Sequence, residues 1–152
     1  MVANSNASAI NYGNIIVSND AGIYAFPNAT QNINCGTIIV GNNSFGMFSN
    51  ANNNSVNCGS IYIYGSNSFG MSVYENNNTT NFGNINIFRN GSYGIYAYKT
   101  TSAVNYGSIS VAGNNSYGIF ADNSTNKNCG SISVFGTGGH GMFAKNGSQN
   151  IN

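Results

Sequence analysis

Hydrophobic and polar residues alternate along this chain in short segments that recur every 23 or 24 residues. Each copy opens with Asn, an aromatic residue or Cys, and Gly, and then alternates, as in Ser108-Ile109-Ser110-Val111. After a turn rich in Gly, Asn and Ser, a second short apolar block follows, as in Tyr117-Gly118-Ile119-Phe120-Ala121. A polar loop then leads to the next copy. Alternation with a period of two predicts strands with one buried face.

Two aliphatic positions recur in the first block of every copy, and their spacing predicts the fold class. The first position holds Ile15, Ile38, Ile61, Ile85, Ile109 and Ile132. The second holds Val17, Val40, Ile63, Ile87, Val111 and Val134. Because one copy cannot bury its apolar face alone, the copies must stack. We predict an all-β, single-stranded parallel β-solenoid, a β-helix of about six coils with two strands per coil.

The repeat predicts one β-solenoid domain over residues 1–152. Its parts are a partial coil at 1–10 and coils at 11–33, 34–56, 57–80, 81–104, 105–127 and 128–152. The chain begins in the middle of a coil and stops where another would begin, so we expect a fragment of a longer repeat protein. The alternative is that open coil ends stack head to tail into a fibre. A helical fold is disfavoured by the many β-branched residues and glycines, and a leucine-rich repeat by the absence of Leu.

The asparagines that open the copies are predicted to form a structural ladder. They are Asn11, Asn34, Asn57, Asn81, Asn105 and Asn128. Stacked amide side chains hydrogen-bond to one another along the axis and satisfy buried backbone groups at a turn. The glycines are expected at tight corners, where φ is positive.

The fullest copy, Asn105 to Ala121, reads Asn-x-Gly-x-Ile-x-Val-x-Gly-Asn-x-Ser-x-Gly-Ile-x-Ala. This pattern resembles the repeats in the passenger regions of large Gram-negative autotransporter adhesins, and the resemblance extends over essentially the whole chain. It implies a right-handed β-helix, an extracellular or cell-surface location, and a stalk or binding surface for adhesion or aggregation.

Charged residues are scarce, and their scarcity excludes some classes of function. Only 5% of residues are charged and the net charge is +1, whereas a globular domain has about 25% charged residues. Four scattered basic residues cannot form a nucleic-acid interface, and no apolar run is long enough to span a membrane. In a stacked solenoid a charged position would meet its own copy about 4.8 Å away, so columns of like charge are avoided.

Few residues suggest catalysis, and we predict no catalytic, cofactor or metal site. Cys35, Cys58 and Cys129 fall in the position that Tyr12, Phe82 and Tyr106 fill in other copies. We expect them in an apolar, packed position, since parallel in-register side chains suit a disulfide poorly. Three thiols and one His do not make a zinc site. Asp20, Glu75 and Asp122 are predicted to be solvated turn residues, and His140 to replace a ladder aromatic.

Two series of aromatic residues recur in the second block. One is Tyr24, Phe48, Tyr96, Phe120 and Phe143, interrupted by Ser72, and the other is Phe45, Phe69, Tyr93 and Tyr117. An odd separation means that both cannot face the core of a regular strand. The inward parity of Ile23 and Ala25 places the Tyr24 series outside. This candidate surface aromatic stripe either binds sugars or a neighbouring rod, or only stabilises the coil stack.

These features favour a non-enzymatic, extracellular structural or adhesive segment. Its expected partners are itself, through coil-end stacking or lateral bundling, or a host-cell or glycan surface. The alternative is a self-assembling fibre subunit, which low charge favours because little repulsion opposes lateral packing. Ice binding and polysaccharide processing are weaker alternatives: the outward positions before the core Ile residues include only one Thr, and the carboxylates do not share one position.

Overall fold

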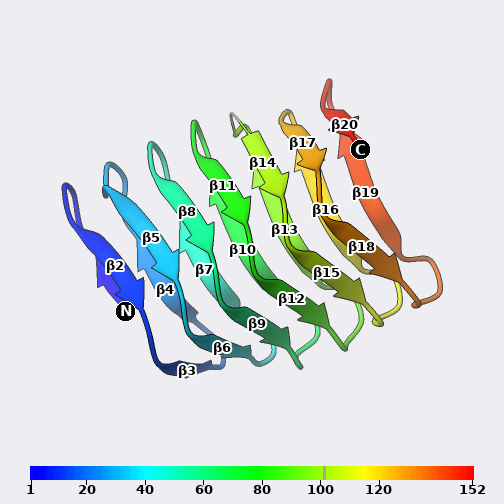
Figure 1. The fold of residues 1–152 in the computed structure, drawn as a ribbon, viewed down its shortest axis with the longest axis horizontal. Helices are drawn as coiled ribbons and strands as arrows, with labels where there is room; N and C mark the ends of the chain where they lie inside the picture. Colours follow the sequence, from blue (N-terminus) through cyan, green and yellow to red (C-terminus); the bar gives the residue numbers. More distant parts are fainter. Residues whose placement is uncertain (101) are drawn as a thin grey trace.

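A computed structural model describes residues 1–100 and 102–152 and shows a parallel β-solenoid of about six coils (Figure 1). The chain winds through stacked coils, and equivalent segments of successive coils pair side by side in parallel. The predicted all-β solenoid is confirmed. The strands of the coils form three parallel sheets. We call them the aromatic, asparagine and isoleucine sheets after the residues that distinguish them.

Each sheet takes one strand from every coil. The aromatic sheet contains β1 (Val2–Ala3), β4 (Ala21–Ala25), β7 (Phe45–Ser49), β10 (Phe69–Tyr74), β13 (Tyr93–Tyr98), β16 (Tyr117–Asp122) and β19 (His140–Lys145). The asparagine sheet contains β2 (Ser8–Asn11), β5 (Gln31–Asn34), β8 (Asn54–Asn57), β11 (Asn78–Asn81), β14 (Ser102–Asn105), β17 (Thr125–Asn128) and β20 (Gln149–Ile151). The isoleucine sheet contains β3 (Asn14–Val17), β6 (Thr37–Val40), β9 (Ser60–Ile63), β12 (Asn84–Ile87), β15 (Ser108–Val111) and β18 (Ser131–Val134).

The prediction of two strands per coil is wrong, because the end of the polar loop forms the strands of the asparagine sheet. In β5, Asn32 and Asn34 face inward and are buried, whereas Ile33 faces outward and is half-buried. Because polar residues face inward and apolar residues face outward, the sequence pattern does not predict a buried strand here. The inward amides find hydrogen-bond partners in the interior: Asn32 donates to Ser49 Oγ at 3.0 Å and Asn34 to Asn57 Oδ1 at 2.8 Å.

The core is built from columns of identical or similar side chains. Ile38, Ile61, Ile85 and Ile109 are at most 1% exposed. Ile15 and Ile132, in the same column, pack against this core but are only partly buried. They lie in the two edge strands of the isoleucine sheet, β3 and β18, so a neighbouring coil covers each of them on one side only. In-register pairing of strands β3, β6, β9, β12, β15 and β18 aligns this column.

The turns explain the high asparagine content and correct the expectation for glycine. Positive φ is adopted mainly by Asn, for example Asn43 at 49° and Asn67 at 53° in equivalent turns, with Gly91 at 67° in the same position one coil later. Short polar Asn side chains tolerate this left-handed conformation better than other non-glycine residues. Most glycines have ordinary φ values and are required where backbones approach closely. A Cβ added at Gly59 would lie 2.0 Å from the carbonyl oxygen of Gly36.

The predicted asparagine ladder is present. From Asn11 onward each amide donates from Nδ2 to Oδ1 of the equivalent residue in the next coil, at 2.7–2.8 Å, and the last link reaches Asn152. Each Nδ2 also donates to the carbonyl oxygen of the Gly two residues later, as Asn81 does to Gly83 at 3.1 Å. The ladder therefore holds the corner between the asparagine and isoleucine sheets in register.

Candidate binding surface on the aromatic sheet

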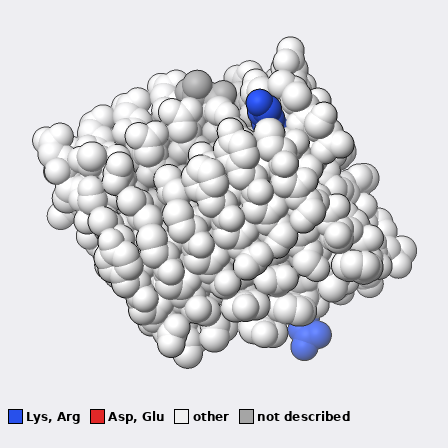
Figure 2. Space-filling view, in the orientation of Figure 1, with Lys and Arg blue, Asp and Glu red and all other residues white. Residues whose placement is uncertain are grey.

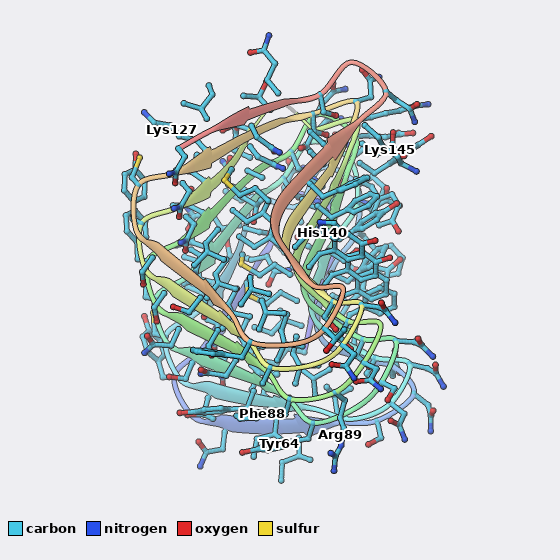
Figure 3. All side chains as sticks on the ribbon, turned by 90° about the vertical axis from the view of Figure 1, so that its right-hand side faces the viewer. Tyr64, Phe88, Arg89, Lys127, His140 and Lys145 are labelled. Carbon is cyan, nitrogen blue, oxygen red and sulfur yellow. The ribbon has the colours of Figure 1, made fainter. Side chains whose placement is uncertain are left out.

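The outer surface of the aromatic sheet carries three adjacent columns of rings, which we call the aromatic face. In Figure 3 this sheet lies at the right of the coil cross-section. The first column is Phe45, Phe69, Tyr93, Tyr117 and His140. The second is Tyr24, Phe48, Tyr96, Phe120 and Phe143, with Ser72 between Phe48 and Tyr96. The third contains Phe26, Tyr74 and Tyr98.

The structure places both predicted aromatic series outside, because each strand breaks its alternation at a glycine. In β7, Gly46 and Met47 are both buried, while Phe45 and Phe48 on either side are half-buried on the outer surface. A Cβ at Gly46 would lie 2.6 Å from the carbonyl oxygen of Gly70 and 3.2 Å from Cγ2 of Ile61. The inner position admits only hydrogen, so two consecutive residues face inward. A regular strand, assumed from the sequence, would have pointed one series into the core.

The rings stack along the columns and meet edge to face between them. Phe45, Phe69 and Tyr93 have successive centroid distances of 4.9 Å and interplanar angles of 13° and 6°. Between columns, Tyr93 and Tyr96 lie 5.4 Å apart at 83°. Both arrangements suit the ring quadrupole, and each such pair contributes about 0.5–1.5 kcal/mol beyond area burial. Because neighbouring rings cover the ring faces, the surface presents mainly ring edges.

The interruption at Ser72 is bridged by a ring from the neighbouring column. Tyr74 lies 5.4 Å from Phe48 and 5.9 Å from Tyr96, and is tilted toward both. Ser72 is fully buried beneath this surface, and its Oγ has no hydrogen-bond partner among the described residues. The aromatic contacts therefore continue without a break from one end of the face to the other.

Two tyrosines at the centre of this face, Tyr93 and Tyr96, have raised pKa values. Burial raises the pKa of Tyr96 to about 12, and the charges of nearby tyrosines and Asp122 add to the effect. Burial also raises the pKa of Tyr93, with a further contribution from Tyr117. Ionisation of these phenols is disfavoured by desolvation and by like charge. The centre of the aromatic face is thus uncharged.

Charge enters only at the margin of the aromatic face. Asp122 was expected in a solvated turn, but it is buried at the end of β16. It occupies the position equivalent to Lys145 in β19 and forms an ion pair of 3.0 Å with it. Lys145 Nζ also lies 5.3 Å from the ring centroid of Phe120. Burial alone would raise the pKa of Asp122, but a hydrogen bond from Asn146 and the contact with Lys145 lower it below its ordinary value.

We predict that acid weakens the fold slightly through Asp122. Its pKa is lower in the folded chain than in the unfolded chain, so its contribution is present above the unfolded value of about 3.9. That contribution disappears as pH falls through the folded value. For an ion pair with an exposed partner the effect is about 0.5–1 kcal/mol. Urea unfolding between pH 7 and pH 2.5 measures it, and Asp122→Asn should remove this part of the pH dependence. An equal acid-induced loss in Asp122→Asn would contradict the assignment.

The three cysteines are exposed, contrary to the packed position expected for them. Their column follows the asparagine ladder, and since the ladder residue faces inward, the next residue faces outward. Tyr12 in the same column is 78% exposed, and Phe82 and Tyr106 stack at 5.2 Å on the surface. The recurrence of aromatic residues here suggested a core position, although an exposed stacking column produces the same pattern.

The remaining candidates lie apart from one another. Asp20 and Glu75 are exposed turn residues, and His140 stacks on Tyr117 at 5.2 Å as part of the first aromatic column. Residues 1–100 and 102–152 contain no group of three or more His, Cys, Asp or Glu side chains that could hold a metal ion. In that same part of the chain no helix could span a bilayer.

The face formed by the asparagine and isoleucine sheets also carries few charges. Figure 2 shows isolated basic side chains and no acidic one on that view. Tyr64 and Phe88 stack at 4.7 Å at the foot of the coils, beside Arg89 (Figure 3).

Comparisons of this chain with family models, with curated proteins and with solved structures find no match.

Proposed function

We propose that this chain is a non-enzymatic structural and adhesive segment of an extracellular surface protein, and that the aromatic face is its contact surface. One observation carries the proposal: two in-register columns of rings, with a shorter third column beside them, form a surface across successive coils whose charged groups lie only at its margin. Most of the rings are half-buried, and together they form one contiguous, partly exposed apolar surface; contiguous apolar surface marks interaction sites on other proteins. The resemblance of the repeat to autotransporter passenger repeats supports the extracellular location and the adhesive role.

The stacked rings suit repeated, weak contacts with an extended partner such as a cell-surface glycan layer. Each ring is held by neighbours above, below and beside it, so little side-chain entropy is lost on contact. Tyrosines combine an apolar ring with a hydroxyl that hydrogen-bonds to polar groups of a partner. The same geometry recurs from coil to coil, so contacts add along the rod.

The proposal is tested by attachment of beads coated with the purified chain to epithelial cell monolayers, with and without prior glycosidase treatment. We expect attachment, and a fall of about tenfold in a Tyr93→Ser, Tyr117→Ser double variant, because aromatic residues dominate contact energies. Attachment should also fall after deglycosylation.

The matched control is a Phe82→Ser, Tyr106→Ser double variant, which removes an exposed stacked pair outside the aromatic sheet. Circular dichroism verifies that both variants keep the β fold. Equal attachment of the two variants would contradict the aromatic face as the contact surface, and no attachment by the unaltered chain would contradict the adhesive role.

Self-assembly into a fibre is a second candidate, favoured by the similarity of the coils. The isoleucine and asparagine ladders continue in register through successive coils, so the interface between any two neighbouring coils resembles the others. Few charges oppose lateral packing. Electron microscopy of the purified chain tests this candidate: filaments that lengthen with concentration are expected, and discrete short rods under all conditions would contradict it.

A further inference from the structure

Cys35 and Cys58 form a pair of exposed thiols at equivalent positions of adjacent coils. Backbone bonds continue the ladder through them: Cys35 N donates to Asn11 O at 2.8 Å and Cys58 N to Asn34 O at 2.7 Å. The asparagine ladder precedes each Cys, and a closely packed Gly follows it. A Cβ at Gly59 would meet Gly36 O at 2.0 Å, so the two cysteines cannot shift relative to each other without disturbing this corner.

The coil spacing sets the separation of the two cysteine backbones. In-register neighbours in parallel sheets are about 4.8 Å apart and their side chains point the same way. A disulfide needs sulfur atoms about 2.05 Å apart, with crossed side-chain directions. A metal ion with bonds of about 2.3 Å to each sulfur instead places them about 3.8–4.6 Å apart, depending on the bond angle. Parallel stacked thiols therefore fit a bridging metal ion better than a disulfide.

The register of the asparagine sheet places the two thiols side by side. Asn34 and Asn57, which directly precede the cysteines, are partners in the pairing of β5 with β8, so Cys35 and Cys58 occupy equivalent positions of adjacent coils. Both side chains are exposed. The two thiols are therefore placed to share one ligand, and a cation bound by both would displace one proton from each.

The neighbouring residues select the type of metal. The column continues with Tyr12 on one side of the pair and Phe82 on the other, and no third His, Cys, Asp or Glu joins the two thiols among the described residues. Zinc prefers four ligands in a closed site. A soft monovalent ion such as Cu(I) is suited by thiolate ligands. We propose that Cys35 and Cys58 are a two-coordinate bis-thiolate site for a soft monovalent cation, with Cu(I) as the representative ion.

Cys129 provides a control inside the same molecule. It occupies the same column and is also exposed, but Phe82 and Tyr106 separate it from Cys58. A single thiol cannot supply both ligands. Cys129→Ser should therefore leave metal binding unchanged, whereas Cys35→Ser and Cys58→Ser should each abolish the two-sulfur site.

The test is an anaerobic Cu(I) titration of the reduced chain against a competing chromogenic chelator, with X-ray absorption to count sulfur ligands. We expect one Cu(I) per chain with two sulfur ligands, and a loss of affinity of about 100-fold or more in Cys35→Ser and Cys58→Ser. Because two protons leave, apparent affinity should rise about 100-fold per pH unit below the thiol pKa values. A Cys35→Ser, Phe82→Cys variant rebuilds the pair one coil along and should regain binding.

Three results would overturn the proposal. One is a Cys58→Ser chain that binds Cu(I) as tightly as the unaltered chain. Another is an equal loss of binding in Cys129→Ser. The third is a copper-linked dimer in size-exclusion chromatography, which would mean that the two sulfurs come from different chains. Because the cysteines are exposed, serine variants are expected to keep the fold, and circular dichroism verifies this.

Discussion

Replacing Asn81 by Ala is expected to lower the free energy of unfolding by about 2–4 kcal/mol. Asn81 accepts a hydrogen bond from Asn57 Nδ2 and donates to Asn105 Oδ1, both at 2.7 Å, and it donates to Gly83 O at 3.1 Å. It is fully buried, so water cannot replace the lost partners. Each buried polar group left without a partner costs about 1–3 kcal/mol. Urea unfolding monitored by circular dichroism measures the change.

Asn78 on the same strand, β11, is the matched control. Its side chain is exposed and its link to Asn54 is long, at 3.4 Å. Asn78→Ala should change stability by less than about 0.5 kcal/mol, as surface substitutions usually do. If both variants lost equal stability, strand propensity and not the buried amide ladder would be responsible.

Gly83→Ala is expected to destabilise the chain by about 3 kcal/mol or more, beyond most single substitutions. The added Cβ would lie 1.9 Å from the carbonyl oxygen of Gly59 and 2.9 Å from the carbonyl carbon of Cys58. These are backbone atoms, which cannot rotate away as a side chain would. The coils must separate locally, which breaks the ladder bonds on both sides. Urea unfolding, or the soluble yield when the chain does not fold, measures the effect.

Gly13 fills the same position in the first coil and has no atom within 4 Å of an added Cβ. Gly13→Ala should therefore be within about 0.5 kcal/mol of the unaltered chain. A comparable loss of stability at both positions would indicate that backbone propensity, and not the close approach of the coils, determines the glycine requirement.

The solenoid and its two main ladders could be predicted because their residues repeat in type as well as in position. The Asn at the position of Asn57 and the Ile at the position of Ile61 recur in every coil, since each side chain must fit an equivalent side chain above and below it. The strands of the asparagine sheet are not evident in the sequence because most of their inward residues are polar: a buried Asn32 beside an outward Ile33 reverses the usual alternation. Burial of such amides is decided by partners from another strand, which a local pattern does not contain.

The geometry of the aromatic face depended on contacts that no spacing reveals. The outward direction of Phe45 follows from Gly46, whose inner side is filled by Gly70 and Ile61. Tyr74 completes the stack across Ser72 from a neighbouring column. For the cysteines, the predicted packed position was wrong, because the column that they share with Tyr12 lies on the exposed outer side of the corner.

The in-register ladders impose an unusual rule on changes of chain length. Removing or duplicating a whole coil returns every side chain to a position that already fits it. The free energy of unfolding then changes by roughly the contribution of one coil and of one interface between coils. Inserting a single residue within a strand reverses the faces of all that follow until the next turn. Recombination between the repeated gene segments would therefore lengthen or shorten the rod in whole coils, while small insertions would persist only in the turns.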